Sequence, residues 1–132
     1  MDQDIRCKQR FGNFNNAFQL LKEVQKLDYS KLSQLEKEGI VQRFEFTLEL
    51  AWKTLKDKME NDGLILDQIS PKSVVREAFA NKYIDQADEW FQMISNRNLL
   101  SHTSDVSVFE KVVPVILNEY VSVFEGLINK LK

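Results

Sequence analysis

Apolar residues recur at spacings of three and four along nearly the whole chain, which is the period of an amphipathic α-helix. The clearest stripe comprises Val41, Phe44, Leu48, Ala51, Trp52, Leu55 and Met59. Turn-forming residues are scarce, since the 132 residues include only four glycines and two prolines. A turn-rich β protein needs many more of both. The pattern therefore predicts an all-α fold.

Interruptions in this pattern divide the chain into five helices. We expect them at about residues 4–27, 31–61, 70–79, 85–101 and 105–131. The third is short, and short connections join the four long ones. Such a chain predicts an antiparallel up-and-down four-helix bundle with one additional short helix. Because this length suits one domain, we expect residues 1–132 to form a single helical-bundle domain.

Local signals mark where the helices begin and end. We expect Ser30 to cap the second helix, and Ser70 followed by Pro71 is typical of a helix start. Asp85 is expected to begin the fourth helix, and Gly63 lies where a glycine would end the second. The residues between Gly63 and Ser70 are predicted to form a loop.

The last predicted helix is apolar on more than one face. Val115, Leu117, Val121 and Ile128 lie off its main stripe, so this helix needs cover on two sides. We expect the second face to be a subunit interface; the alternative is that Val115 and Val121 are simply exposed. Pro114 lacks a backbone N–H, so it should kink the helix or mark a frayed first part.

Charge and cysteine content restrict the class of protein. The net charge of −2 disfavours nucleic-acid binding by bulk positive charge, although a local basic pocket would still permit RNA binding. The single Cys7 cannot form an internal disulfide, which fits a reducing compartment. The acidic N-terminus is followed by no apolar run, and no stretch approaches eighteen consecutive apolar residues. We therefore expect a cytoplasmic protein with no membrane span.

One short stretch, residues 97–102, combines side chains that are able to do chemistry. Histidine exchanges protons near neutral pH, and His102 is the only histidine in the chain. One His and one Cys do not supply a classical metal site, and the sequence has no P-loop, dinucleotide-binding glycine motif or nucleophile elbow. We accordingly expect neither a metal nor a cofactor.

If the fourth helix reaches this stretch, Asn98 and His102 share one face, and Arg97 and Ser101 form the neighbouring row. An arginine fork stabilises negative charge on phosphorus, and a histidine takes or gives a proton. Because one histidine per chain is short of a separate acid and base, a two-fold dimer would supply two facing copies. The alternative is that His102 is an ordinary helix cap and Arg97 an ordinary surface ion pair.

A second charged group lies on the polar positions of the second helix. It comprises Arg43, Glu45, Glu49, Lys53 and Lys56. Glu45 and Glu49, like Glu49 and Lys53, are four residues apart and therefore neighbours on a helix. The group either binds a ligand or partner or is a solvated charged face. The two tryptophans, Trp52 and Trp90, are predicted to be core residues.

Three segments together resemble a known family. They are residues 43–56 (RFEFTLELAWKTLK), residues 70–79 (SPKSVVREAF) and, after Trp90, residues 97–103 (RNLLSHT). In this order, and over about residues 5–130, the chain resembles the nucleotidyltransferase substrate-binding proteins of the HEPN superfamily. The resemblance implies a bundle like the helical domain of kanamycin nucleotidyltransferase, and a homodimer with a shared Arg/His cleft. It also implies a partner, a minimal nucleotidyltransferase, which joins the homodimer in a heterotetramer.

The first function that the resemblance implies is RNA cleavage. The protein would be the metal-independent endoribonuclease toxin of a toxin–antitoxin module, with Arg97 and His102 as catalytic residues and Asn98 orienting the site. The partner neutralises such a toxin, in some pairs by adenylylating a Tyr two residues after the His. This chain has Ser104 at that position, so the candidate modification sites are Ser104 and Thr103.

The second implied function is binding without catalysis. The chain would then be a subunit that presents a substrate, such as a nucleotide, to the nucleotidyltransferase. Its binding residues would come from the second-helix group and the cleft, namely Glu45, Glu49, Lys53, Asn98 and Ser101. A third alternative is a helical scaffold that only pairs with another protein.

Overall fold

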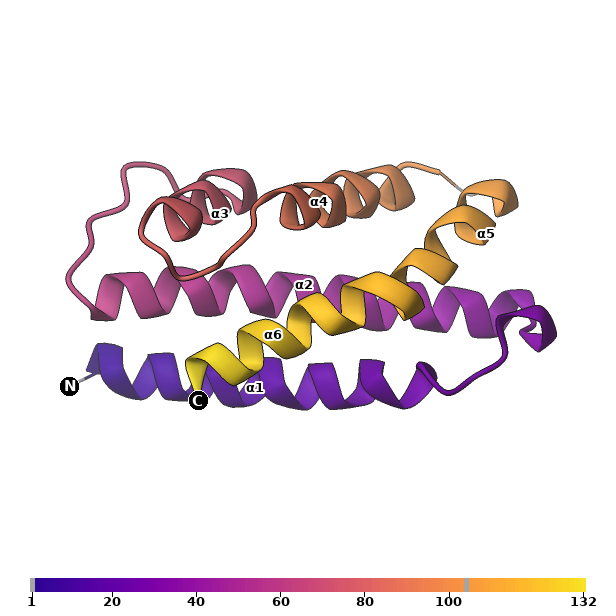
Figure 1. Cartoon of the computed structure of the whole chain (residues 1–132), viewed down its shortest axis with the longest axis horizontal. Coiled ribbons are helices and arrows are strands. Elements are labelled where there is room, and N and C mark those ends of the chain that lie inside the picture. Colours follow the sequence, from indigo (N-terminus) through magenta and orange to yellow (C-terminus); the bar gives the residue numbers. More distant parts are fainter. Residues whose placement is uncertain (1, 104) are drawn as a thin grey trace.

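The computed structural model describes residues 2–103 and 105–132, and helices dominate this part of the chain (Figure 1). In order they are α1 (Asp2–Val24), the short 3₁₀ turn η1 (Tyr29–Lys31), α2 (Gln34–Asn61), α3 (Pro71–Ala80), α4 (Asp88–Ser101), α5 (Val106–Val115), the π-helical segment η2 (Ile116–Tyr120) and α6 (Val121–Leu131). Since α5, η2 and α6 form one continuous helix, the predicted bundle of four long helices and one short helix is confirmed.

The helices run up and down beside one another. In Figure 1, α1 and α2 lie antiparallel along their whole lengths, α3 and α4 lie in line above α2, and α5–α6 crosses back over α1 and α2. α1 ends three residues before the boundary predicted from the sequence. The loop between α2 and α3 is where the sequence predicts it. This arrangement brings the end of α4 beside the middle of α2.

The start of α2 differs from the prediction. Ser33 caps α2, because its hydroxyl accepts a hydrogen bond from the Glu36 N–H while the Glu36 carboxylate accepts one from the Ser33 N–H. Ser30 lies in η1 instead, where its hydroxyl and N–H donate to Asp28. A serine three residues before a glutamate is the stronger start signal, because the serine hydroxyl satisfies an N–H of the first helical turn and the glutamate carboxylate satisfies the N–H of the serine.

The predicted start of α3 and the predicted end of α2 are confirmed, whereas the predicted start of α4 is wrong. Ser70 caps α3 and Pro71 is its first residue, and Gly63 follows α2 with a φ of 98°. α4 begins at Asp88, three residues after Asp85, and has no side-chain cap. The Asp85 carboxylate instead contacts the Lys130 ammonium of α6 at 2.8 Å. A tertiary ion pair thus replaces the local cap.

The last helix buries both of its apolar faces inside the chain. Leu117, Val121 and Ile128 are all at most 5% exposed, and Val115 is partly buried. The prediction that these residues form an interface with a second subunit is therefore wrong. The buried pairs 112/113, 116/117 and 120/121 repeat every four residues, because the wider π-helical turn keeps successive pairs on the core side.

An aromatic cluster joins the long helices at the centre of the core. The Phe124 ring of α6 contacts Phe14, Phe44 and Trp90, with ring centroids 5.9 to 6.3 Å apart. Tyr120 stacks on Phe44 at 5.4 Å. Trp52 and Trp90 are 8% and 3% exposed, so the prediction that both are core residues is confirmed. Burial of large rings on four helices fixes how these helices pack.

The helix from Val106 to Leu131 is long and apolar enough to cross a membrane by length and composition alone. Half of its most apolar window is buried in the bundle. A core helix of a globular protein has the same signature, so this helix does not indicate a membrane protein.

Candidate functional site

The stretch 97–102 is the last turn of α4 and the residue that ends it. Trp90, Met93, Ile94 and Leu100 anchor α4 in the core through one face. Arg97 lies at the edge of that face, with 42% of its side chain exposed. The helix therefore holds Arg97 between the core and solvent, where its guanidinium is accessible to a ligand.

Arg97 faces α2 across the bundle. Its Nε lies 3.9 Å from Oε2 of Glu45, and the Ser101 hydroxyl lies 3.4 Å from the same oxygen. The Ser101 hydroxyl is also 3.0 Å from the Arg97 carbonyl, as the four-residue spacing predicts. In the isolated chain, Arg97 therefore makes the surface ion-pair contact that the alternative interpretation of this residue expects.

His102 ends α4. Its backbone N–H donates to the Leu99 carbonyl at 3.2 Å, and its φ of −113° is no longer helical. Its side chain is exposed, and its imidazole makes no hydrogen bond within residues 2–103 and 105–132. Asn98 is exposed as well. The structure therefore places Arg97, Asn98, Ser101 and His102 at one solvent-facing helix end.

Glu49 lies one turn along α2 from Glu45 and has different partners. The Trp52 indole N–H donates to it at 3.1 Å, and the Lys53 ammonium lies 3.0 Å away. Partial burial raises the pKa of this carboxyl, but the hydrogen bonds from Lys53 and Trp52 outweigh that effect. The positive charges of Lys53 and Arg97 add to them, so the pKa of Glu49 lies below its usual value.

The remaining charged residues of α2 lie elsewhere. The Arg43 guanidinium donates to the Leu20 carbonyl at 2.7 Å and contacts Glu23, both on α1. The Lys56 ammonium contacts the neighbouring Asp57 and Glu60 of α2. The five α2 residues singled out from the sequence therefore do not form one face, and of these five only Glu45 and Glu49 lie near Arg97.

The candidate modification sites follow directly after His102. The Thr103 hydroxyl accepts a hydrogen bond from the Asp105 N–H at 3.0 Å, and Thr103 is partly buried. Ser104 lies outside the described residues.

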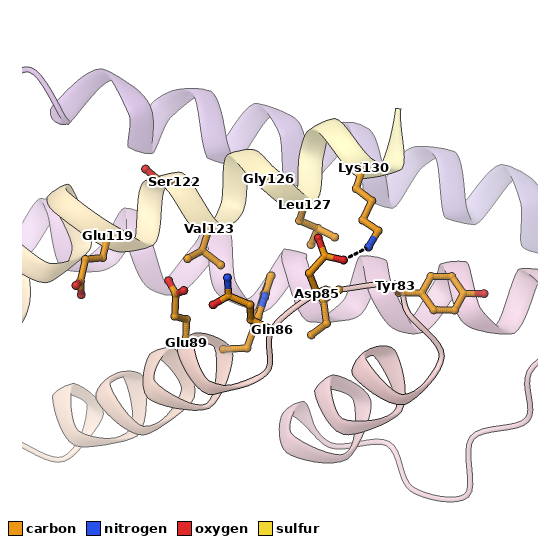
Figure 2. Close-up of a pocket in the computed structure, with 12 residues that line it drawn as sticks. Tyr83, Asp85, Gln86, Glu89, Glu119, Ser122, Val123, Gly126, Leu127 and Lys130 are labelled. Carbon is orange, nitrogen blue, oxygen red and sulfur yellow. Dashed lines mark hydrogen bonds and ion pairs between the residues drawn. The ribbon is translucent and has the colours of Figure 1, made fainter.

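A pocket of about 290 Å³ lies away from this helix end, between the start of α4 and α6 (Figure 2). Its apolar lining includes Trp90 and Val123, and Asp85, Glu89 and Glu119 bring carboxylates to it. No residue from 97 to 102 lines it. This pocket and the Arg97/His102 stretch are therefore separate features.

Within the described ranges, no three His, Cys, Asp or Glu side chains gather as a set that could hold a metal ion. Two carboxylates of α2 make polar contacts that were not predicted from the sequence. Glu45 contacts Arg97 and Ser101, and the buried Asp57 contacts Arg10 of α1 at 3.1 Å. Glu45 and Ser101 are 56 positions apart, and no local pattern relates residues at that separation.

Comparisons with known proteins agree on one family. The sequence profile of the family described as nucleotidyltransferase substrate binding protein like matches residues 9–132. A protein of Haemophilus influenzae named probable ribonuclease HepT is 34% identical over 70 residues, which are 51% of this chain and 48% of that protein. The chain thus aligns with about half of this relative.

A crystal structure of a protein from Thermus thermophilus has a similar fold. The TM-score is 0.79 at 29% sequence identity, over 90% of this chain and 98% of that one. The profile match covers nearly the whole sequence, including the α2 and α4 residues described above. This chain belongs to the nucleotidyltransferase substrate binding protein-like family.

Proposed function

We propose that this protein is a metal-independent endoribonuclease, the cytoplasmic toxin of a toxin–antitoxin module whose other component is a minimal nucleotidyltransferase. Membership of the family and the similarity to a probable ribonuclease support the proposal. The observation that carries it is the helix end at 97–102, where an exposed histidine directly follows the helix that holds a half-exposed arginine. The family name supports the identity of the partner.

The chemistry requires only these two side chain types and the RNA itself. The His102 imidazole takes the proton of a ribose 2′-hydroxyl, and the 2′-oxygen attacks the neighbouring phosphorus. The bond from phosphorus to the 5′-oxygen breaks, and that oxygen receives a proton. The Arg97 guanidinium stabilises the negative charge that develops on the phosphoryl oxygens. The products are a 2′,3′-cyclic phosphate and a 5′-hydroxyl end, and Asn98 orients the RNA.

A second copy of the chain supplies the second histidine, which protonates the leaving oxygen. Two exposed apolar side chains, Leu99 and Val106, lie on either side of His102 in the sequence and are 49% and 48% exposed. Their position at the helix end supports a homodimer that meets there, with the partner nucleotidyltransferase completing a heterotetramer. The partner restrains the nuclease by binding or by modifying a hydroxyl of Thr103 or Ser104.

The proposal is tested by RNA cleavage with the purified protein and its His102→Ala variant. We expect His102→Ala to lower the rate by about 10²–10⁴-fold, because a positioned proton-transfer group contributes that much. Arg97→Ala should lose activity as well, whereas Arg76→Ala, which alters an exposed arginine on α3, should not. Equal cleavage by the wild type and His102→Ala would overturn the proposal.

The description of the family as substrate binding proteins favours a second candidate function, a nucleotide-binding subunit for the transferase, but the pocket in Figure 2 is poorly suited to hold the nucleotide. Carboxylates from Asp85, Glu89 and Glu119 line it, so charge repulsion opposes the phosphates of a nucleotide there. In that case the binding residues would be those of the helix end, including Ser101, or of the Glu49 and Lys53 pair. Calorimetry with nucleotides, alone and with the partner, tests this function; binding to an RNase-inactive protein would support it.

A further inference from the structure

Two carboxylates on successive turns of α2 lie near the Arg97 guanidinium, and their contacts differ. Glu49 is held by the Trp52 indole and the Lys53 ammonium, both from its own helix. Within the described part of the chain, the polar contacts of Glu45 are with α4 alone, through the Arg97 Nε and the Ser101 hydroxyl. Glu45 is therefore the α2 carboxylate whose described contacts all belong to the candidate catalytic stretch.

The geometry of the Glu45 contact leaves part of the arginine accessible. The nitrogen nearest the carboxylate is Nε, at 3.9 Å, and not one of the two terminal nitrogens. The Arg97 guanidinium donates no hydrogen bond within residues 2–103 and 105–132. A carboxylate on the Nε edge steadies the plane of the fork and leaves its terminal N–H groups to bind a phosphate.

We propose that Glu45 is a positioning residue that orients Arg97 for the phosphoryl group. This inference rests on the proposed ribonuclease function and assigns Glu45 no contact with RNA. A carboxylate repels a phosphate, so Glu45 acts through the arginine. The need for such a residue is physical, because a half-exposed arginine has many rotamers and loses conformational entropy when it is fixed. Ser101, on the same carboxylate oxygen, ties α2 to the last turn of α4.

The test compares Glu45→Ala with a matched control, Glu60→Ala. Glu60 lies on the same helix, is 31% exposed against 30% for Glu45, and also pairs with a cationic side chain, Lys56. We expect Glu45→Ala to lower kcat for RNA by about 10- to 100-fold with little change in KM, because misplacing a charge-stabilising group raises the barrier. Glu45→Gln should retain part of the activity, since its amide oxygen keeps a polar partner beside Nε and an acceptor for the Ser101 hydroxyl. Glu60→Ala should behave as the wild type.

A second measurement follows Arg97 itself and needs no cleavage. In a nitrogen-15 NMR spectrum, the Nε–H signal of Arg97, assigned with Arg97→Lys, should exchange faster with water in Glu45→Ala and remain unchanged in Glu60→Ala. An unchanged Arg97 signal in Glu45→Ala would overturn the positioning role, and so would equal or higher kcat. If the wild type cleaves RNA and Arg97→Ala does not, either of these two results for Glu45→Ala rejects the positioning role of Glu45 and leaves the proposed ribonuclease function standing. Absence of cleavage by the wild type would instead reject the proposed function.

Discussion

Two residues in the left-handed backbone region end neighbouring helices in the same way. Gly63 follows α2 with a φ of 98°, and Lys82 follows α3 with a φ of 65°. After each helix the next N–H reaches back to a carbonyl of the last turn, Leu64 to Met59 at 2.9 Å and Tyr83 to Ala78 at 2.8 Å. Glycine adopts this conformation readily, whereas lysine has a Cβ that makes it unfavourable.

Exchanging the residue types at these two positions should change stability in opposite directions. Lys82→Gly should raise the free energy of unfolding by about 0.5–1 kcal/mol, because removal of strain exceeds the added entropy of glycine in the unfolded chain. Gly63→Ala should lower it by about 1 kcal/mol, and since a Cβ there would meet nothing within 4 Å, the loss reports the backbone alone. Urea denaturation measures both. A destabilised Lys82→Gly would contradict this account.

At the level of single residues, the sequence predicted Gly63 because glycine marks a helix end by its own chemistry. It could not predict Lys82 in the same role, since nothing in a lysine indicates a positive φ. The sequence predicted Ser70 but placed the cap of α2 at Ser30 rather than Ser33. The difference is the reciprocal hydrogen bond with Glu36, which a search for single capping residues overlooks.

At the level of elements, the last helix carries a proline without breaking. Pro114 has no N–H for the carbonyl of Glu110, four residues earlier. The Tyr29 hydroxyl of η1 donates to that carbonyl at 3.1 Å. The Gln25 side-chain amide similarly donates to the Leu117 carbonyl in η2 at 3.2 Å. The connection between α1 and α2 thus supports both irregular parts of the last helix.

The role of Tyr29 can be isolated in a double-mutant cycle with Pro114. Tyr29→Phe should cost about 0.5–1 kcal/mol in the wild type, because it removes a hydrogen bond and keeps the ring beneath the Lys37 ammonium. In Pro114→Ala the new N–H satisfies the Glu110 carbonyl, so the same substitution should cost less. Chemical denaturation of the four proteins measures the coupling. Equal losses in both backgrounds would show that Tyr29 does not compensate for the proline.

A hydrogen bond between Tyr83 and Asp62 joins the ends of α3 and α2. The Tyr83 hydroxyl donates to the Asp62 carboxylate at 2.6 Å. Burial and this hydrogen bond to Asp62 raise the pKa of Tyr83 to about 12. The same bond lowers the pKa of Asp62 below its usual 3.8. The bond therefore stabilises the fold fully between these limits.

The pH dependence of this hydrogen bond has a definite sign on each side. Because the folded pKa of Tyr83 lies above its unfolded value of 10, the stabilisation is complete below pH 10 and is lost as pH rises through about 12. On the acid side it is lost as pH falls below 3.8 through the lowered pKa of Asp62. In Asp62→Asn the pKa of Tyr83 should fall toward 10, while Asp67→Asn should leave it unchanged. Ultraviolet titration of tyrosinate checks this.

Most of the elements could be predicted because apolar periodicity reports the core face of a helix directly. The π-helical turn Ile116–Tyr120 could not, and Leu117 lies within it and faces the core. Val121 and Ile128 lie in the regular helix α6, three residues before and four residues after Phe124, so ordinary helical spacing already places them on the core side. A sequence pattern assumes regular geometry, so a local change in helix type moves residues between faces.

At the level of the whole molecule, the proposed homodimer meets at the end of α4. Leu99→Glu places a charge on that surface and should shift the protein toward monomer, because an unpaired charge in an interface is costly. Ile65→Glu is the matched control, since Ile65 is 90% exposed in the loop after α2. Sedimentation velocity over a range of concentrations measures both. If Leu99→Glu and Ile65→Glu sediment alike as dimers, the interface lies elsewhere.

The sequence predicted the residues of the candidate site but not their partners. Arg97, Asn98, Ser101 and His102 are adjacent in the chain, so the helical pattern alone brings them together at one helix end. Glu45 reaches them only through packing of α4 against α2, and Asp57 reaches Arg10 only through packing of α2 against α1. Contacts between helices depend on the tertiary fold, which the order of residues along one helix does not specify.

The central claim is that RNA is cleaved by its own 2′-hydroxyl with Arg97 and His102 and without a metal. The most direct measurement is cleavage of a short RNA in the presence of EDTA, with analysis of the new ends. The account predicts a 2′,3′-cyclic phosphate, no cleavage at a position carrying a 2′-deoxyribose, and loss of activity in Arg97→Ala and His102→Ala. Products that end in a 3′-hydroxyl, or cleavage that stops with EDTA, would contradict it.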